Sequence, residues 1–346
     1  MRLKLLTAVL LTLSGFAFFS FTPAAYPDRL SEWQLFTGKL AALQPAKGVV
    51  PYQLNTPLFS DYAEKLRFVQ LPANTAAEYT PNGVLAFPNG TLLIKNFYYP
   101  AVKQPTGKQL VETRLLVNQA GSWIPLTYVW NDEQTEAYLS LAGDEIMVDW
   151  EDTDKQQHTV RYVVPNQNQC KGCHNLNEVV QPIGPSASQL NGEYAYATGT
   201  ANQLSYWNKQ GMLTGMPALH TIAATPVWNN PATGSLEARA RAYLAINCAH
   251  CHRREGPAQT SGLYLTEAET NPTAIGINKT PVAAGKGSGG NRYDIVPGNA
   301  AQSILYYRMF VDSPGERMPE LGRTGAHREG LALIRDWINQ MKTTEK

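Results

Sequence analysis

All four cysteines of the chain lie in two motifs of the same type. Residues 170–174 read Cys-Lys-Gly-Cys-His, and residues 248–252 read Cys-Ala-His-Cys-His. The spacing C-x-x-C-H is the attachment signature of a c-type haem, because two thiols bond to the two vinyl groups and the following histidine binds the iron. We therefore predict two covalently bound haem c groups. The thiols would be those of Cys170, Cys173, Cys248 and Cys251, and the iron ligands His174 and His252.

Three other uses of paired cysteines fit the sequence less well. Disulfide bonds would suit an exported chain, but they do not require a histidine after each second cysteine. A structural zinc site would need both pairs, and the gap between Cys173 and Cys248 is long for a compact site. A thioredoxin-like redox pair needs a βαβ context, which the sequence around either motif does not indicate.

An iron that only transfers electrons takes a second ligand on its other face. For the second haem we predict Met318, which precedes a proline in a loop before the last helical segment. For the first haem we predict Met216, which is also followed by proline. Met212, His220 and an open iron site remain as alternatives for this first haem.

The elements that position these residues differ along the chain. Short runs with strand character, separated by polar turns, fill residues 27–165 and predict an antiparallel β domain. Residues 166–234 form the first haem-binding region. Residues 235–346 have helical periodicity and form the second, with Ser235 as an N-cap and an apolar stripe that includes Trp337 on the last helix. The predicted fold class is a multidomain chain with an N-terminal antiparallel all-β domain followed by mainly α-helical cytochrome c domains.

The composition limits the location and partners of the protein. Residues 1–25 have the basic start, apolar core and small residues of a cleaved signal peptide. This predicts a periplasmic protein without a membrane span after cleavage; an uncleaved segment would instead act as an anchor. The 346 residues carry 29 basic and 28 acidic side chains, so there is no basic excess for nucleic acid.

Two resemblances extend these expectations. The helix that ends in the second motif, the Met318-Pro319 loop and the last helix resemble a class I, mitochondrial-type cytochrome c. Across nearly all of the mature chain, the sequence Asn-Thr-Pro-Leu-Phe-Ser-Asp-Tyr at 55–62 and the two haem motifs resemble a bacterial family of exported di-haem cytochromes. That resemblance implies electron carriage between redox partner proteins of the cell envelope, but it names no substrate.

The first haem departs from the class I plan. A strand-like run, 160–164, precedes Cys170 where the leading helix of that family should be. Pro185 resembles the proline that orients the proximal histidine in the family. We therefore expect the β domain to form a wall of the first haem pocket.

The predicted function is a periplasmic di-haem c-type cytochrome that carries electrons and is not itself an enzyme. One alternative is a di-haem peroxidase-like enzyme with an open first haem, which would need a distal acid or base that the sequence does not assign. Another is a binding module, in which the β domain holds a partner and the haems serve it.

Overall fold

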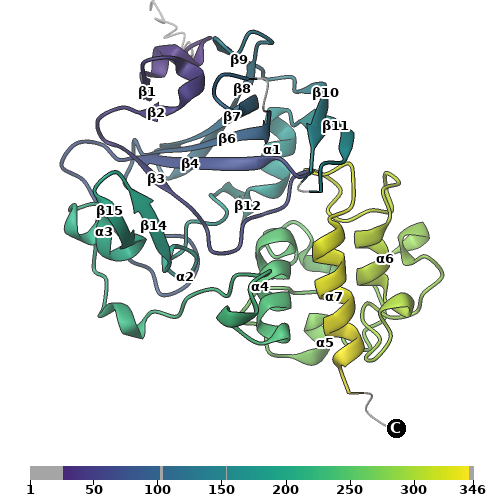
Figure 1. Cartoon of the computed structure of the whole chain (residues 1–346). Helices are drawn as coiled ribbons and strands as arrows, with labels where there is room; N and C mark the ends of the chain where they lie inside the picture. Colours follow the sequence, from purple (N-terminus) through teal and green to yellow (C-terminus); the bar gives the residue numbers. More distant parts are fainter. Residues whose placement is uncertain (1–25, 102–103, 153, 343–346) are drawn as a thin grey trace, which may run out of the picture.

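The computed structural model describes residues 26–101, 104–152 and 154–342. The predicted signal peptide, 1–25, lies outside the described residues. Figure 1 shows a part built around a sheet, followed by a helical part that carries the C-terminus. Among the described helices, none combines the length and the apolar character that crossing a bilayer requires.

A six-stranded antiparallel sheet forms the centre of the first part. Its strand order is β3-β4-β6-β7-β8-β9. The strands are β3 (Val49–Tyr52), β4 (Glu64–Gln70), β6 (Leu92–Pro100), β7 (Lys108–Gln119), β8 (Ser122–Trp130) and β9 (Ala137–Leu139). Successive side chains of a strand point to opposite faces. Phe68 and Ile94 therefore pack with Leu30 and Leu35 on one face, while Val69 faces a second core on the other.

Smaller sheets surround this one. Four are antiparallel pairs: β1 (Phe36–Thr37) with β2 (Gln44–Pro45), β10 (Asp144–Glu151) with β11 (Gln157–Val164), β12 (Asn175–Leu176) with β13 (Val179–Val180), and β14 (Glu193–Tyr196) with β15 (Gly199–Asn202). The fifth pair, β5 (Ala77–Glu78) and β16 (Leu213–Thr214), is parallel and joins residues far apart in the sequence.

Two helices of thirteen residues organise the helical part. Helix α4 (Leu236–Cys248) begins after Ser235, whose hydroxyl accepts a hydrogen bond from the Ala238 N–H at 3.1 Å, so the predicted N-cap is confirmed. Helix α7 (Arg328–Gln340) buries Leu331, Ile334, Trp337 and Ile338 against α4, which confirms the predicted stripe. The remaining helices are α1 (Gln167–Cys173), α2 (Ala187–Leu190), α3 (Gln203–Lys209), α5 (Pro272–Ile275) and α6 (Ile304–Phe310).

The predicted fold class was wrong. The chain is 25% helical and 28% strand, so residues after 165 do not form mainly helical cytochrome c domains. Around the first motif, the described elements are the seven-residue helices α1 and α3, the four-residue helix α2, the hairpins β12–β13 and β14–β15, and the strand β16 that pairs with β5. The sequence there is rich in turn formers: Gly199, with a φ of 117°, closes the second hairpin. Such residues stop helices after one or two turns.

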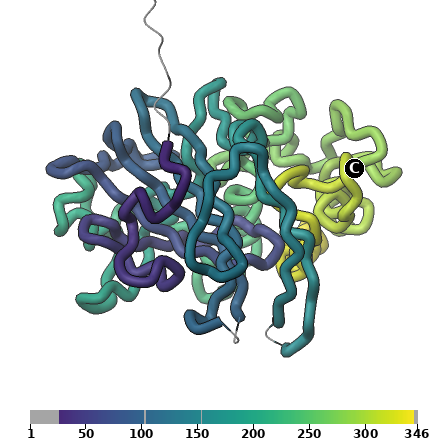
Figure 2. Tube along the Cα trace, turned by 90° about the horizontal axis from the view of Figure 1, so that it is seen from above, coloured from purple at the N-terminus to yellow at the C-terminus, as the bar shows by residue number. Residues whose placement is uncertain are grey.

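The sheet and the helical part are in direct contact through residues 55–62. The side chain of Asn247, on α4, accepts a hydrogen bond from the Phe59 N–H at 2.8 Å. The Phe59 ring stacks on His327, next to α7, at a centroid distance of 4.2 Å. Seen from above in Figure 2, the helical part with the C-terminus lies at one side of the molecule, and the strands and the N-terminal residues lie towards the other.

Candidate functional site

The two C-x-x-C-H motifs lie against each other although they are far apart in the sequence. The Sγ atoms of Cys173 and Cys251 and a ring nitrogen of His250 all lie within 4.8 Å of one another. All four cysteines are free thiols. A hydrogen bond between the Cys173 and Cys251 thiols lowers the pKa of Cys173 and raises that of Cys251.

The first motif is held by a short, well-capped helix. After β11 ends at Val164, the Asn166 side chain accepts from the Gln169 N–H, and the Gln169 side chain accepts from the Asn166 N–H, both at 2.9 Å. This capping box starts α1, so Cys170 and Cys173 lie one turn apart. Cys170 is buried and its thiol contacts Thr127 on β8.

His174 is prepared to bind a metal through one defined nitrogen. Its Nδ1 lies 2.8 Å from the carbonyl oxygen of Gln181. Because a carbonyl only accepts, Nδ1 carries the hydrogen and Nε2 keeps its lone pair. Burial lowers the pKa of His174 to about 3, so the ring is neutral at neutral pH.

His252 has the same arrangement in the second motif. Its Nδ1 lies 3.3 Å from the hydroxyl of Ser261, which donates its own proton to the Ala258 carbonyl. His252 therefore donates through Nδ1 and leaves Nε2 free. Burial lowers the pKa of His252 to about 4.

Each motif lines a separate cavity. The first cavity contains Cys170, Cys173 and His174, and the β-sheet forms one of its walls, as expected from the strand before the first motif. Its other lining residues include Leu54, Leu58, Leu93, Leu116, Ile183, Asn247, His250 and Leu321. The apolar members exclude water from the space next to the His174 ring.

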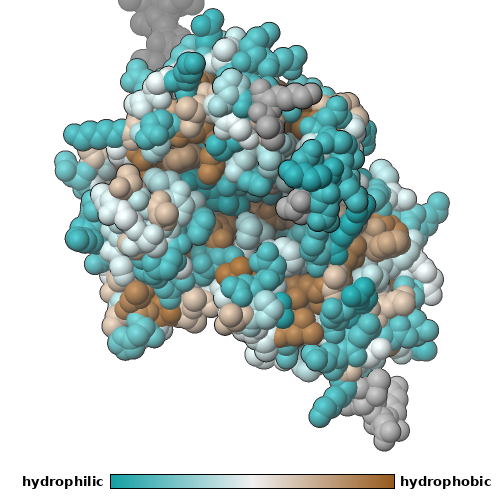
Figure 3. Space-filling view, viewed as in Figure 1, coloured by the Kyte–Doolittle hydropathy of each residue, from teal (hydrophilic) through white to brown (hydrophobic). Residues whose placement is uncertain are grey.

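The second cavity lies beside the first and shares Cys173, Asn247 and His250 with it. It contains Cys248, Cys251 and His252, together with Leu263, Leu265, Leu305, Met309 and Met318. Val282 also lines it and is 71% exposed, so this cavity reaches the surface. On the face shown in Figure 3, apolar residues gather in patches near the boundary between the two parts of the molecule.

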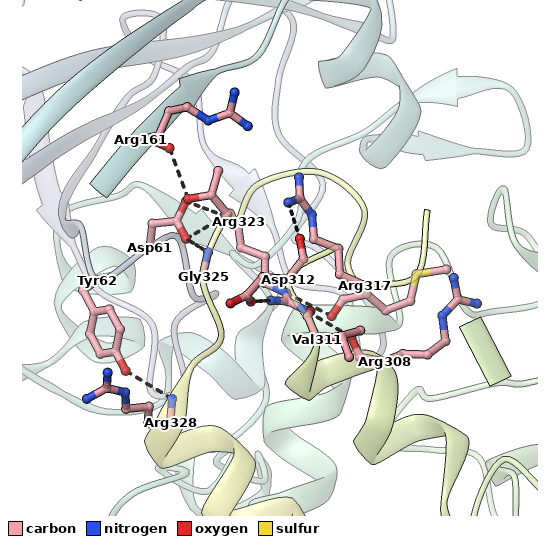
Figure 4. A network of polar contacts seen from close by, with 12 residues as sticks. Asp61, Tyr62, Arg161, Arg308, Val311, Asp312, Arg317, Arg323, Gly325 and Arg328 are labelled. Carbon is pink, nitrogen blue, oxygen red and sulfur yellow. Dashed lines mark hydrogen bonds and ion pairs between the residues drawn. The ribbon is translucent and has the colours of Figure 1, made fainter. Parts of the chain in front are cut away.

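The loop that carries Met318 is fixed by Arg323, which is only 4% exposed. The Arg323 guanidinium donates to the carbonyl oxygens of Met318 at 3.2 Å, Arg308 at 3.0 Å and Val311 at 2.9 Å (Figure 4). The Met318 N–H donates to the Arg308 carbonyl at 2.8 Å. The structure thus brings Met318 and His252 to one cavity, as the sequence predicted.

Met216 does not line the cavity of His174. It packs beside Leu219 at the edge of the core that contains Trp207, together with Met212. The pairing of β16 with β5 holds this segment there, and His220 is exposed. The structure therefore gives no support to Met216, Met212 or His220 as ligands in the first cavity, and its described lining contains no thioether.

Sequence reasoning missed a row of cations in the first cavity. Arg67, Lys95 and Arg114 are register partners on β4, β6 and β7, and all three side chains line the cavity. It also missed His250, which lines both cavities and has a buried Nδ1 without a hydrogen-bond partner in the described part of the chain. The available signal for the row was a lysine in the middle of the apolar run of β6.

The donor set fits haem c at both positions: two thiols, an imidazole with a free Nε2 and a lining with many apolar side chains, with a thioether added in the second cavity. The cluster Cys173, His250 and Cys251 fits structural zinc less well. Such sites use four ligands, and the cluster has only three among the described residues.

No family model, curated protein or solved structure matches the chain.

Proposed function

We propose that the protein is a di-haem c-type cytochrome that carries electrons in the periplasm, after removal of residues 1–25 as a signal peptide. The observation that carries the proposal is the contact between Cys173 and Cys251, because it joins two attachment motifs that each line their own cavity. When bound, haem c supplies reversible one-electron chemistry.

The chain's own residues have distinct tasks in this proposal. Cys170 with Cys173, and Cys248 with Cys251, hold the two groups covalently. The Nδ1 hydrogen bonds of His174, to the Gln181 carbonyl, and of His252, to the Ser261 hydroxyl, fix each ring so that the Nε2 lone pair points away from that partner.

The two cavities differ in the ligands they offer, and this gives a direction to electron flow. Met318 supplies a thioether to the second cavity, and a thioether ligand raises the reduction potential. The first cavity has no thioether among its described lining residues. With haem c at both sites, the higher potential of the second would favour electron transfer from the first site to the second, and the two sites adjoin at Cys173 and Cys251. The exposed Val282 would mark the place where a redox partner protein receives the electron.

The test is production of the full chain in a host that matures c-type cytochromes. We expect an intact mass with two haems, colour that stays with the protein in acid–acetone, and two potentials in a redox titration. The double variant Cys248→Ser/Cys251→Ser should keep one haem, the lower in potential. A wild-type mass with no haem or one haem would overturn the proposal.

A di-haem peroxidase-like enzyme is the second candidate. The observation in its favour is that the first cavity has no thioether but contains His250, whose unpartnered Nδ1 could move a proton. The two candidates separate in one measurement. A high-spin signal together with peroxide turnover that is lost in His250→Phe would establish the enzyme, and a low-spin protein without turnover would exclude it.

A further inference from the structure

Five side chains form a straight row across the sheet, on the face towards the first cavity. The Cα register runs Tyr52↔Arg67, Arg67↔Lys95, Lys95↔Arg114 and Arg114↔Thr127, and all five residues line the cavity. Direct register partners on adjacent strands are about 5 Å apart. The three central members are all cations.

The positive charge of this row exceeds the negative charge around it. Arg114 forms an ion pair with Glu112, which is fully buried and also accepts from the Tyr162 hydroxyl. Arg67 is 7% exposed, and among the described residues the side chains of Arg67 and Lys95 form no ion pair and no hydrogen bond. Lys65, two residues before Arg67, adds a further charge close to the Phe97 ring.

The Phe97 ring compensates only part of this charge. Lys95 Nζ lies 4.8 Å from the ring centroid, and the Arg114 guanidinium lies 4.4 Å from it. A cation over an aromatic face is attracted to it, but the ring carries no net charge. Burial, followed by the charges of Arg67 and Arg114, lowers the pKa of Lys95 well below its ordinary value. The cavity therefore lacks anions to balance its cations.

The order of the residues along the row indicates which of them would bind the missing anions. Thr127, at one end, contacts the Cys170 thiol. Arg114 is next to Thr127 in the row, whereas Lys95 and Arg67 follow at increasing distance from the attachment cysteine. In haem c the two carboxylates lie on the edge of the macrocycle opposite the edge that bonds to cysteine.

We propose that Arg67 and Lys95, with Arg114 adding positive charge beside them, form a carboxylate-binding site for the two propionates of the first haem; this inference rests on the proposed function. Two carboxylates supply the charge that Arg67 and Lys95 lack. The row keeps both carboxylates ionised, and its net positive charge raises the reduction potential of the first site.

The experiment compares the full, haem-loaded chain with Arg67→Gln and Lys95→Met. Lys95→Met keeps an unbranched side chain on Phe97 and is the variant to use if Arg67→Gln does not fold. The control is Lys171→Gln, which removes an equal charge from an exposed position between the two cysteines of the first motif. The potentials of both haems are measured between pH 5 and 8, with circular dichroism to verify folding.

In the wild type and in Lys171→Gln, we expect the first potential to be independent of pH over this range. In each row variant that potential should fall, and it should acquire a slope approaching one proton per electron, because one propionate now titrates. The second potential should not change. The other titratable groups that face the row are Tyr52, Lys65, Glu112, Tyr162, Cys170 and His174.

Two results would overturn the inference. One is a row variant whose first potential matches that of Lys171→Gln at every pH. The other is a wild-type first-haem spectrum that shifts on addition of nitrate or nitrite and no longer does so in Lys95→Met, because the row then holds a free anion. A chain without haem would instead contradict the proposed function, and the intact mass identifies that case.

Discussion

The carboxylate of Asp61 accepts a hydrogen bond at 2.9 Å from the N–H of Gly325, 264 residues later in the chain. Asp61 belongs to residues 55–62, the segment through which the sheet contacts the helical part. The neighbouring Thr324 N–H donates to the same carboxylate at 2.8 Å (Figure 4). Asp61 is 4% exposed, and burial raises its pKa despite these bonds. The sheet part thus fixes the loop that follows Met318.

Replacing Asp61 with Asn tests this connection. Asn tolerates the positive φ of 46° at this position, so the backbone should be kept, while the charge-assisted acceptor is lost. We expect the free energy of unfolding, measured with urea, to decrease by about 1–3 kcal/mol. Asp149→Asn is the control, because Asp149 is exposed and its side chain accepts only from Thr159 within the described part of the chain. Equal stability of the two variants would contradict the structural role of Asp61.

Replacing Met318 with Ala should remove a thioether ligand from the second site. We expect loss of a charge-transfer band near the red edge of the visible spectrum, and a fall in one potential on the order of 0.1 V. The other potential should change little. Met216→Ala is the matched control, since Met216 lies outside both cavities. If Met216→Ala loses the band and Met318→Ala retains it, the ligand assignment is wrong.

His327 makes the stability of the protein depend on pH. Burial lowers its pKa from 6.5 to about 4, and its Nδ1 lies 2.9 Å from the Tyr243 hydroxyl. Between these values the unfolded chain binds a proton that the folded chain does not, so stability is complete above pH 6.5 and falls as the pH decreases towards 4.

The slope contributed by this one group is at most about 1.4 kcal/mol per pH unit. His327→Phe keeps an aromatic ring on Phe59 and Tyr243 but removes the titration. Chemical unfolding of the haem-loaded protein at several pH values should therefore give a flatter profile in this variant below pH 6.5. An unchanged profile would assign the pH dependence to other groups.

Local patterns in the sequence predicted the parts of the sites that depend on neighbours in the chain. The Ser235 cap, the buried face of α7 and the strand that leads into α1 each follow from a few adjacent residues. Met318 was predicted as a ligand because it precedes a proline in a loop just before the last helix, and the structure places it between α6 and α7.

The features that the sequence could not predict depend on pairing between strands that are far apart in the chain. Met216 has the same Met-Pro pattern as Met318, but the β5–β16 pair holds its segment beside another core. The row Arg67, Lys95 and Arg114 exists only because three strands align in one register. No local pattern contains that alignment.

The walls of the first cavity come from the whole length of the chain, from Tyr52 to Gly322. During synthesis, the Cys170 and Cys173 thiols are made well before the segment that includes Leu321. Until that segment is in place the cavity lacks the part of its wall formed by Pro319, Leu321 and Gly322. If the proposed haem is attached at Cys170 and Cys173, a maturation enzyme would therefore have to reach the first motif before the last quarter of the chain folds.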